Sequence, residues 1–171
     1  MPFRALCTSA HPLRRTHAIL NKVVLDHVLI VDDEESVRRI LARWIKTIGY
    51  ETIEADCAEA GLEAMTANPA AVVFCDVQMP GQGGLWLAGV LRTKFPQAAI
   101  VLATGVTTVP ATTSMRSGIL AYLTKPFDEP AVRDALQRSM VWHNAAVAAG
   151  TRSSQPEDEG KELQAWLESL E

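Results

Sequence analysis

The sequence has few cysteines, no excess of positive charge and no long hydrophobic run. Its three cysteines, Cys7, Cys57 and Cys75, form no CxxC pair, and their odd number argues against a disulfide framework. The net charge is −4 and the isoelectric point is near 5.6, so no overall positive field favours nucleic acid or an anionic membrane surface. No apolar run approaches the roughly 18 residues that a membrane span needs. We therefore expect a cytoplasmic protein that contacts neither nucleic acid nor a membrane directly.

The chain of 171 residues suits one ordinary domain with short extensions, and is too short for two full-sized domains. Residues 1–25 contain basic side chains and no acid, and we expect them to form a poorly ordered N-terminal extension. Their composition also resembles a transit peptide, which stays an alternative to a disordered leader or an over-extended start. Residues 26–143 are the predicted folded domain. Residues 144–160 become Ala-rich and then acidic and polar, which predicts a flexible acidic linker.

Residues 161–171 have the pattern of a short amphipathic helix. Leu163, Trp166, Leu167 and Leu170 fall on one helical face. Because isolated helices this short are marginal in water, the apolar face needs a surface to cover. Two alternatives stay open: the segment folds back onto its own domain, or it docks in the groove of a partner.

Strand-like and helix-like segments alternate through the predicted domain. Strands are expected at residues 27–31, 50–55, 71–75, 98–103 and 119–123. Helices are expected at residues 36–48, 57–67, 85–95, 110–117 and 128–142, of which 110–117 is rich in threonine, a poor helix former. This alternation predicts an α/β fold, a doubly wound five-stranded parallel sheet with helices on both faces. Ligands in such sheets bind at the carboxyl ends of the strands.

Polar side chains follow the predicted strands at those carboxyl ends. Asp32 and Asp33 come after the first strand, Asp76 ends the third, Thr104 ends the fourth and Lys125 follows the fifth. Each alone has an ordinary explanation as a helix cap, a strand end or a solvated charge. Together they place three carboxylates at one edge of the sheet, where they repel one another unless a cation offsets them. The oxygen ligands suit Mg²⁺, which is typically held by one or two carboxylates and phosphate oxygens.

Four segments carry a resemblance to a known family: residues 31–34 (VDDE), 76–81 (DVQMPG) with Gly84, 103–105 (ATG) and 122–127 (YLTKPF). In this order and spacing they resemble the receiver domain of two-component response regulators, over residues 27–142. Each motif is weak on its own, whereas the set is highly specific. The resemblance implies a flavodoxin-like fold with strand order 2-1-3-4-5.

The resemblance also implies roles for single residues. Asp76 would be the phosphoacceptor, a carboxylate nucleophile that takes a phosphoryl group from a histidine kinase, a phosphotransfer protein or a small phosphodonor. Asp32, Asp33, Asp76 and the backbone carbonyl of Gln78 would hold Mg²⁺ as the cofactor. Lys125 would pair with the acceptor carboxylate and then with a phosphoryl oxygen, aimed by a cis bond at Pro126.

A switch and an output surface follow from the same resemblance. Thr104 would bond the attached phosphoryl group, and Tyr122, the switch aromatic, would then turn inward. The signal would reach an unknown downstream protein through the surface of helix 110–117, strand 119–123 and helix 128–142. Homodimerisation through that surface is common in the family. The chain would be a single-domain regulator without a DNA-binding or enzymatic output domain, and would catalyse only its own phosphorylation and dephosphorylation.

Two other function classes are alternatives to this one. Haloacid-dehalogenase-type phosphatases also use a strand-end Asp, Mg²⁺ and a lysine. A DxDx arrangement after the first strand is typical of them, whereas this chain has Glu34 in the second acidic place. A receiver-like scaffold that never uses its phosphosite is the third class. One departure from the family is Gly83, which stands where the family often has Asp.

Overall fold

A computed structural model describes residues 26–105 and 118–150. Four sequence-based predictions lie outside these residues: the N-terminal extension 1–25, the helix 110–117, most of the linker 144–160 and the amphipathic segment 161–171. Within the described ranges, no helix is both long and apolar enough to cross a membrane.

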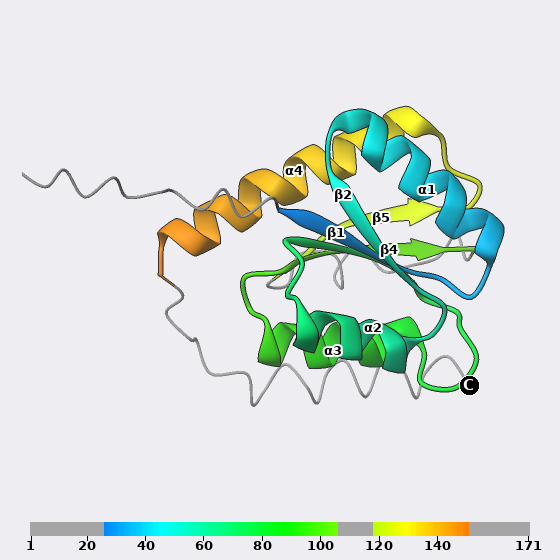
Figure 1. Ribbon diagram of the computed structural model, residues 1–171, viewed down its shortest axis with the longest axis horizontal. Helices are drawn as coiled ribbons and strands as arrows, with labels where there is room; N and C mark the ends of the chain where they lie inside the picture. The colour runs from blue at the N-terminus through cyan, green and yellow to red at the C-terminus, as the bar shows by residue number, and fades with distance from the viewer. Residues whose placement is uncertain (1–25, 106–117, 151–171) are drawn as a thin grey trace, which may run out of the picture.

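Five strands and four helices make up the described part of the chain (Figure 1). They are β1 (His27–Val31), α1 (Glu35–Ile48), β2 (Glu51–Ala55), α2 (Ala58–Ala67), β3 (Val72–Asp76), α3 (Gly84–Lys94), β4 (Ala99–Thr104), β5 (Ile119–Thr124) and α4 (Glu129–Ala148). All strand pairs are parallel, in the order β2-β1-β3-β4-β5. The predicted fold class and strand order are therefore confirmed.

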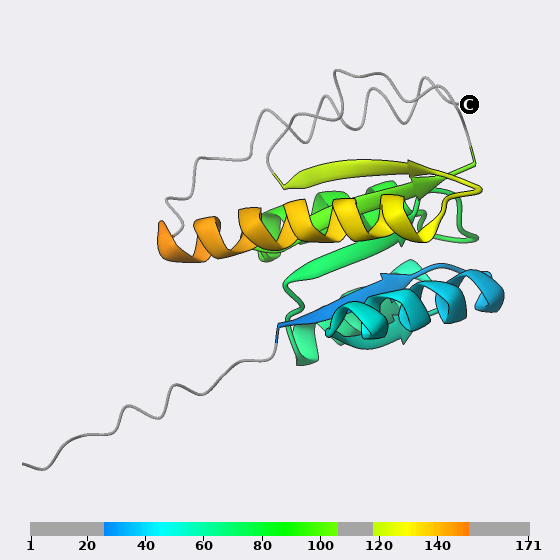
Figure 2. The same cartoon turned by 90° about the horizontal axis from the view of Figure 1, so that it is seen from above.

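Helices cover both faces of the sheet, α1 and α4 on one side and α2 and α3 on the other (Figures 1 and 2). Alternate residues of β1 pack into the two cores: Leu29 and Val31 toward α2 and α3, Val28 and Ile30 toward α1 and α4. Strands β1, β3 and β4 are buried throughout, which explains their uninterrupted apolar sequences. On the α1 side, the rings of Trp44 and Phe127 pack edge to face, with their centroids 6.5 Å apart.

The last helix is longer than its sequence pattern predicts. We expected it to end at Trp142, whereas α4 continues to Ala148, so the first residues of the predicted flexible linker are helical. The physical reason is that residues 144–148 are mostly alanine, the strongest helix former, and contain no breaker. The ring of His143 also bonds the backbone carbonyl of Gln97 at 2.7 Å, which ties this part of the helix to the segment before β4.

Candidate functional site

The polar residues predicted to converge do meet at the carboxyl edge of the sheet. Asp76 is the last residue of β3 and Thr104 the last of β4, each one residue further into its strand than expected, and Asp32 directly follows β1. The three side chains are buried, with 5%, 1% and 1% of their surfaces exposed. Side chains this polar are rarely buried without partners, so their contacts define the site.

Three carboxylates form a tight cluster at this edge. Asp32, Asp33 and Asp76 each offer an oxygen within 4.8 Å of the oxygens of the other two, and Asp33 is exposed while the others are buried. Burial raises the pKa of Asp32, with the nearby charge of Asp76 in the same direction, although hydrogen bonds from Lys125 and from the backbone of Glu34 oppose the shift. The cluster thus concentrates negative charge where water screens it poorly.

Lys125 supplies the cation that faces this cluster. Its Nζ lies 2.8 Å from Oδ2 of Asp76, 2.9 Å from Oδ2 of Asp32 and 3.3 Å from Oε1 of Glu34. Burial disfavours the charged ammonium, but the hydrogen bonds to Asp76 and Asp32 outweigh it, and the pKa of Lys125 is raised. Lys125 is therefore a fixed positive charge at neutral pH.

The backbone around Lys125 also holds it in place. Its N–H donates to the carbonyl of Thr104 at 2.8 Å, and its peptide bond to Pro126 is cis.

One ammonium against the carboxylates of Asp32, Asp33 and Asp76 leaves the site with excess negative charge. All the offered atoms are carboxylate oxygens, the ligands that Mg²⁺ favours, so these residues fit a magnesium ion.

The loop after β3 presents the acceptor carboxylate. The backbone N–H of Gln78 donates to Oδ1 of Asp76 at 3.1 Å, so the two oxygens of Asp76 face different donors. Gly84 begins α3 so close to this loop that an added Cβ would lie 1.8 Å from the carbonyl oxygen of Asp76. Glycine is therefore required at position 84. That the backbone carbonyl of Gln78 is a ligand of Mg²⁺ stays a prediction.

Thr104 and Tyr122 lie on the same side of the sheet. Leu102 pairs with Tyr122 and Thr104 with Thr124, and Leu102 packs toward α3, so alternation places both predicted switch residues on that face. The Tyr122 hydroxyl is buried and has no hydrogen-bond partner among residues 26–105 and 118–150. Burial raises the pKa of Tyr122, and the positive charge of Arg92 partly offsets this shift.

Two contacts at the site were not predicted from the sequence. Glu34 approaches Lys125, and Arg38 of α1 donates to the backbone carbonyls of Asp32 and Asp33. A basic residue one turn into the helix that follows an acid pair was the available signal. It is weak, because α1 carries several basic residues and only the path of the loop decides which one reaches the carbonyls.

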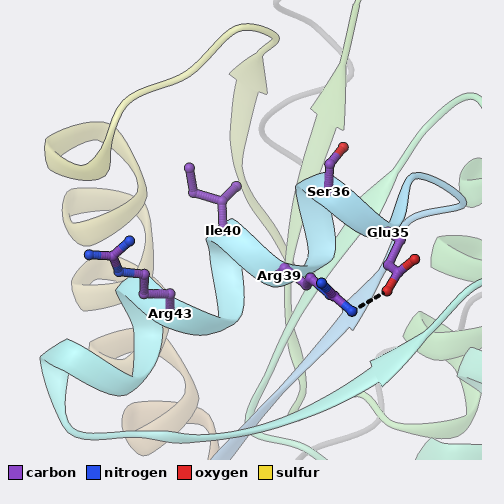
Figure 3. Close-up of a pocket in the computed structure, with 5 residues that line it drawn as sticks. All are labelled: Glu35, Ser36, Arg39, Ile40 and Arg43. Carbon is purple, nitrogen blue, oxygen red and sulfur yellow. Dashed lines mark ion pairs between the residues drawn. The ribbon is translucent and has the colours of Figure 1, made fainter.

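A surface hollow of about 430 Å³ lies on the outer side of α1 (Figure 3). It is lined by Glu35, Ser36, Arg39, Ile40 and Arg43. None of the predicted site residues lines it, so the acid cluster is part of the strand edge and not of this hollow.

The family model of the response regulator receiver domain matches residues 28–137. The chain belongs to this family. The match includes the acids of the cluster and Lys125, and it favours a receiver over the dehalogenase-type phosphatase.

Similar curated proteins are longer than this chain. Response regulator protein FleR of Pseudomonas aeruginosa is 36% identical over 112 residues, which are 65% of this chain and 24% of FleR. Photosynthetic apparatus regulatory protein RegA of Rhodovulum sulfidophilum is 36% identical over 110 residues, 64% of this chain and 60% of RegA. The chain thus spans less than two thirds of either relative.

Solved receiver structures resemble the chain over nearly their whole length. Chemotaxis protein CheY4 of Vibrio cholerae matches with a TM-score of 0.60 and 27% identity, over 67% of this chain and 98% of CheY4. The receiver domain of NtrX from Brucella abortus matches with a TM-score of 0.62 and 26% identity, again over 67% and 98%. The likeness is confined to the receiver fold.

Proposed function

We propose that the chain is a phosphoacceptor switch of a two-component phosphorelay, which takes a phosphoryl group on Asp76 with the help of Mg²⁺. The donor would be a histidine kinase, a phosphotransfer protein or a small phosphodonor, in the cytoplasm. The observation that carries the proposal is the contact of one ammonium, Lys125, with the carboxylates of both Asp76 and Asp32 at distances below 3 Å. A buried acid held between a lysine and two further acids is arranged for nucleophilic attack on phosphorus beside a cation.

The residues around Asp76 suggest how the transfer would run. A carboxylate oxygen of Asp76 attacks the phosphorus in line, and the bond from phosphorus to the donor atom breaks with its electron pair staying on the donor. Asp32, Asp33, Asp76 and the Gln78 carbonyl would hold Mg²⁺, which when bound neutralises charge on the phosphoryl oxygens. Lys125, already 2.8 Å from Asp76, would shift its hydrogen bond to a phosphoryl oxygen.

The acyl phosphate would then change the switch residues. It adds roughly −1.5 to −2 charge and three strong acceptors beside Thr104, whose hydroxyl would bond one of them. Tyr122 lies on the same face and would follow by repacking, which biases an existing two-state equilibrium. The readout would be contact with a downstream protein, and the chain would catalyse only its own phosphorylation and dephosphorylation.

Labelling by acetyl phosphate tests the acceptor assignment. With Mg²⁺ present, the unsubstituted chain should take up label and Asp76→Asn should take up none, because the amide is not a nucleophile toward phosphorus. Asp134→Asn is the matched control, since Asp134 forms an exposed ion pair with Arg138 on α4 and should leave labelling unchanged. Continued labelling of Asp76→Asn would show that another residue accepts the group.

Amide hydrogen exchange distinguishes a working switch from a scaffold that never uses its phosphosite. We expect protection in residues 110–117 to change when beryllofluoride and Mg²⁺ are added together. The same addition to Asp76→Asn should leave protection unchanged. An unsubstituted chain that binds beryllofluoride without any change in exchange would support the scaffold.

A further inference from the structure

The backbone that carries the acid pair is held by a side chain from the following helix. Arg38, near the start of α1, donates from Nη1 to the carbonyl of Asp32 at 2.7 Å and to the carbonyl of Asp33 at 3.2 Å. Only 15% of the Arg38 side chain is exposed. One guanidinium therefore bridges two successive peptide groups, those of two of the three acids in the cluster.

The same guanidinium is approached from the sheet. Its Nε lies 3.9 Å from Oε2 of Glu54, which pairs in register with Ile30 on β1. The loop that carries Asp32 and Asp33 has a second contact with the sheet, because the N–H of Asp32 donates to the carbonyl of Ala55 at 3.2 Å. Arg38 thus links α1, the edge strand β2 and the loop between β1 and α1.

The neighbouring arginine offers a contrast within one turn of helix. Arg39 is 76% exposed and pairs with Glu35 at 2.6 Å on the outer side of α1 (Figure 3). The two residues have the same charge, the same helix and adjacent positions. They differ in whether the guanidinium reaches the loop carbonyls, which makes Arg39 a matched control.

We propose that Arg38 is a positioning residue for the magnesium site: its guanidinium fixes the loop backbone so that the carboxylates of Asp32 and Asp33 converge with that of Asp76. This inference rests on the proposed function, because it presumes that the acid cluster binds Mg²⁺. Arginine suits the task, since both bonds come from Nη1, whose hydrogens are fixed in the plane of the guanidinium, whereas the ammonium of lysine is a point charge on a flexible stem.

Charge and geometry make opposite predictions for this residue. A guanidinium near the site repels a second cation, so if its charge dominated, replacing Arg38 with a neutral residue would strengthen Mg²⁺ binding. If the hydrogen bonds of Arg38 to the loop carbonyls (the Arg38 clamp) dominate, the same replacement frees the loop and weakens Mg²⁺ binding. Groups that orient metal ligands typically contribute 10-fold to 100-fold in metal affinity. The sign of the change therefore identifies the role.

The test is a titration of the full chain with MgCl₂ alone, followed by NMR through the backbone amides of Asp33 and Gln78. We expect Arg38→Gln to bind Mg²⁺ about tenfold more weakly than the unsubstituted chain. Arg38→Lys should also bind more weakly, because it keeps the charge but loses the planar guanidinium that aims Nη1. Arg39→Gln should stay within about twofold, since it removes an equal charge without touching the loop.

Several results would overturn the inference. Mg²⁺ binding in Arg38→Gln that equals or exceeds that of the unsubstituted chain would show that the guanidinium does not position the ligands. Full affinity in Arg38→Lys would show that the planar guanidinium is not needed to position the loop. Should the unsubstituted chain show no Mg²⁺-dependent shifts, the proposed magnesium site would fail first, and the clamp with it. Dispersed spectra of Arg38→Gln and of Arg38→Lys establish that each variant keeps the fold.

Discussion

A single methyl group at Gly84 should disrupt both the start of α3 and the acceptor residue. A Cβ at this position would lie 1.8 Å from the carbonyl oxygen of Asp76, 2.7 Å from its carbonyl carbon and 2.8 Å from Sγ of Cys75. Ordinary Cβ contacts begin near 3.4 Å, so the helix start or the Asp76 carbonyl would have to move by about 1.6 Å. Two of the three atoms are backbone atoms of a buried strand, so rotation of the Cys75 side chain would leave the clash with Asp76 unrelieved.

The magnitude follows from that lack of an escape. Overpacking of a close-packed interior costs about 1–3 kcal/mol, and a clash with strand backbone belongs at the upper end, about 3 kcal/mol. For a domain of this size the melting temperature should fall by roughly 10 °C. Urea denaturation of Gly84→Ala at neutral pH measures the loss, and acetyl phosphate labelling of the folded fraction should be slower because the acceptor is displaced.

The adjacent glycine provides the control. A Cβ at Gly83 would lie 3.3 Å from the carbonyl of Val77, a contact that a shift of a few tenths of an ångström relieves. Gly83→Ala should therefore cost less than about 1 kcal/mol, mostly from replacing a favourable cap residue. If Gly84→Ala proved no less stable than Gly83→Ala, the close approach of α3 to Asp76 would be refuted.

Three further predictions concern charge and reactivity at the same edge. Lys125→Met should lose about 2 kcal/mol of unfolding free energy without metal, because two buried carboxylates lose their cation; urea denaturation with and without Mg²⁺ checks this, and an unchanged midpoint would contradict it. Because burial raises the pKa of Asp32 above 3.8, its ionised form costs stability at neutral pH. Asp32→Asn should then be the more stable chain at pH 7 without metal, and a gain that fails to shrink as the pH falls toward 3.8 would refute this. Burial, together with the charges of Asp76 and Asp32, raises the pKa of Cys75, so its thiol should resist iodoacetamide until the chain unfolds, as mass spectrometry of the labelled cysteine would show.

Most of the fold was predictable from local sequence because the strands and helices have distinct patterns. The uninterrupted apolar runs of β1, β3 and β4 match their complete burial, and Gly49 ends α1 in a left-handed conformation that glycine adopts without strain. The length of α4 was not predictable in the same way. The alanines of residues 144–148 favour a helix, but the polar and acidic residues that follow favour a linker, and the contact of His143 with Gln97 is long-range.

The site was predictable to the extent that parallel strands end at a common edge. That rule placed Asp32, Asp76, Thr104 and Lys125 together before any distance was known. It could not reveal Arg38, because that side chain recognises backbone carbonyls, which every residue has. It also could not show that Lys125 would contact Glu34, since the reach of a long side chain depends on the path of its loop.

The buried hydroxyl of Tyr122 has a consequence for how easily the ring moves. Burying a hydroxyl without a hydrogen bond costs about 1–3 kcal/mol, which rotation into water would recover, whereas apolar packing against the α2 and α3 side favours the inward position. Among residues 26–105 and 118–150 the hydroxyl has no hydrogen-bond partner, so within this part of the chain apolar packing alone holds the ring, and a change of charge at the neighbouring strand end meets no polar contact there that must break first.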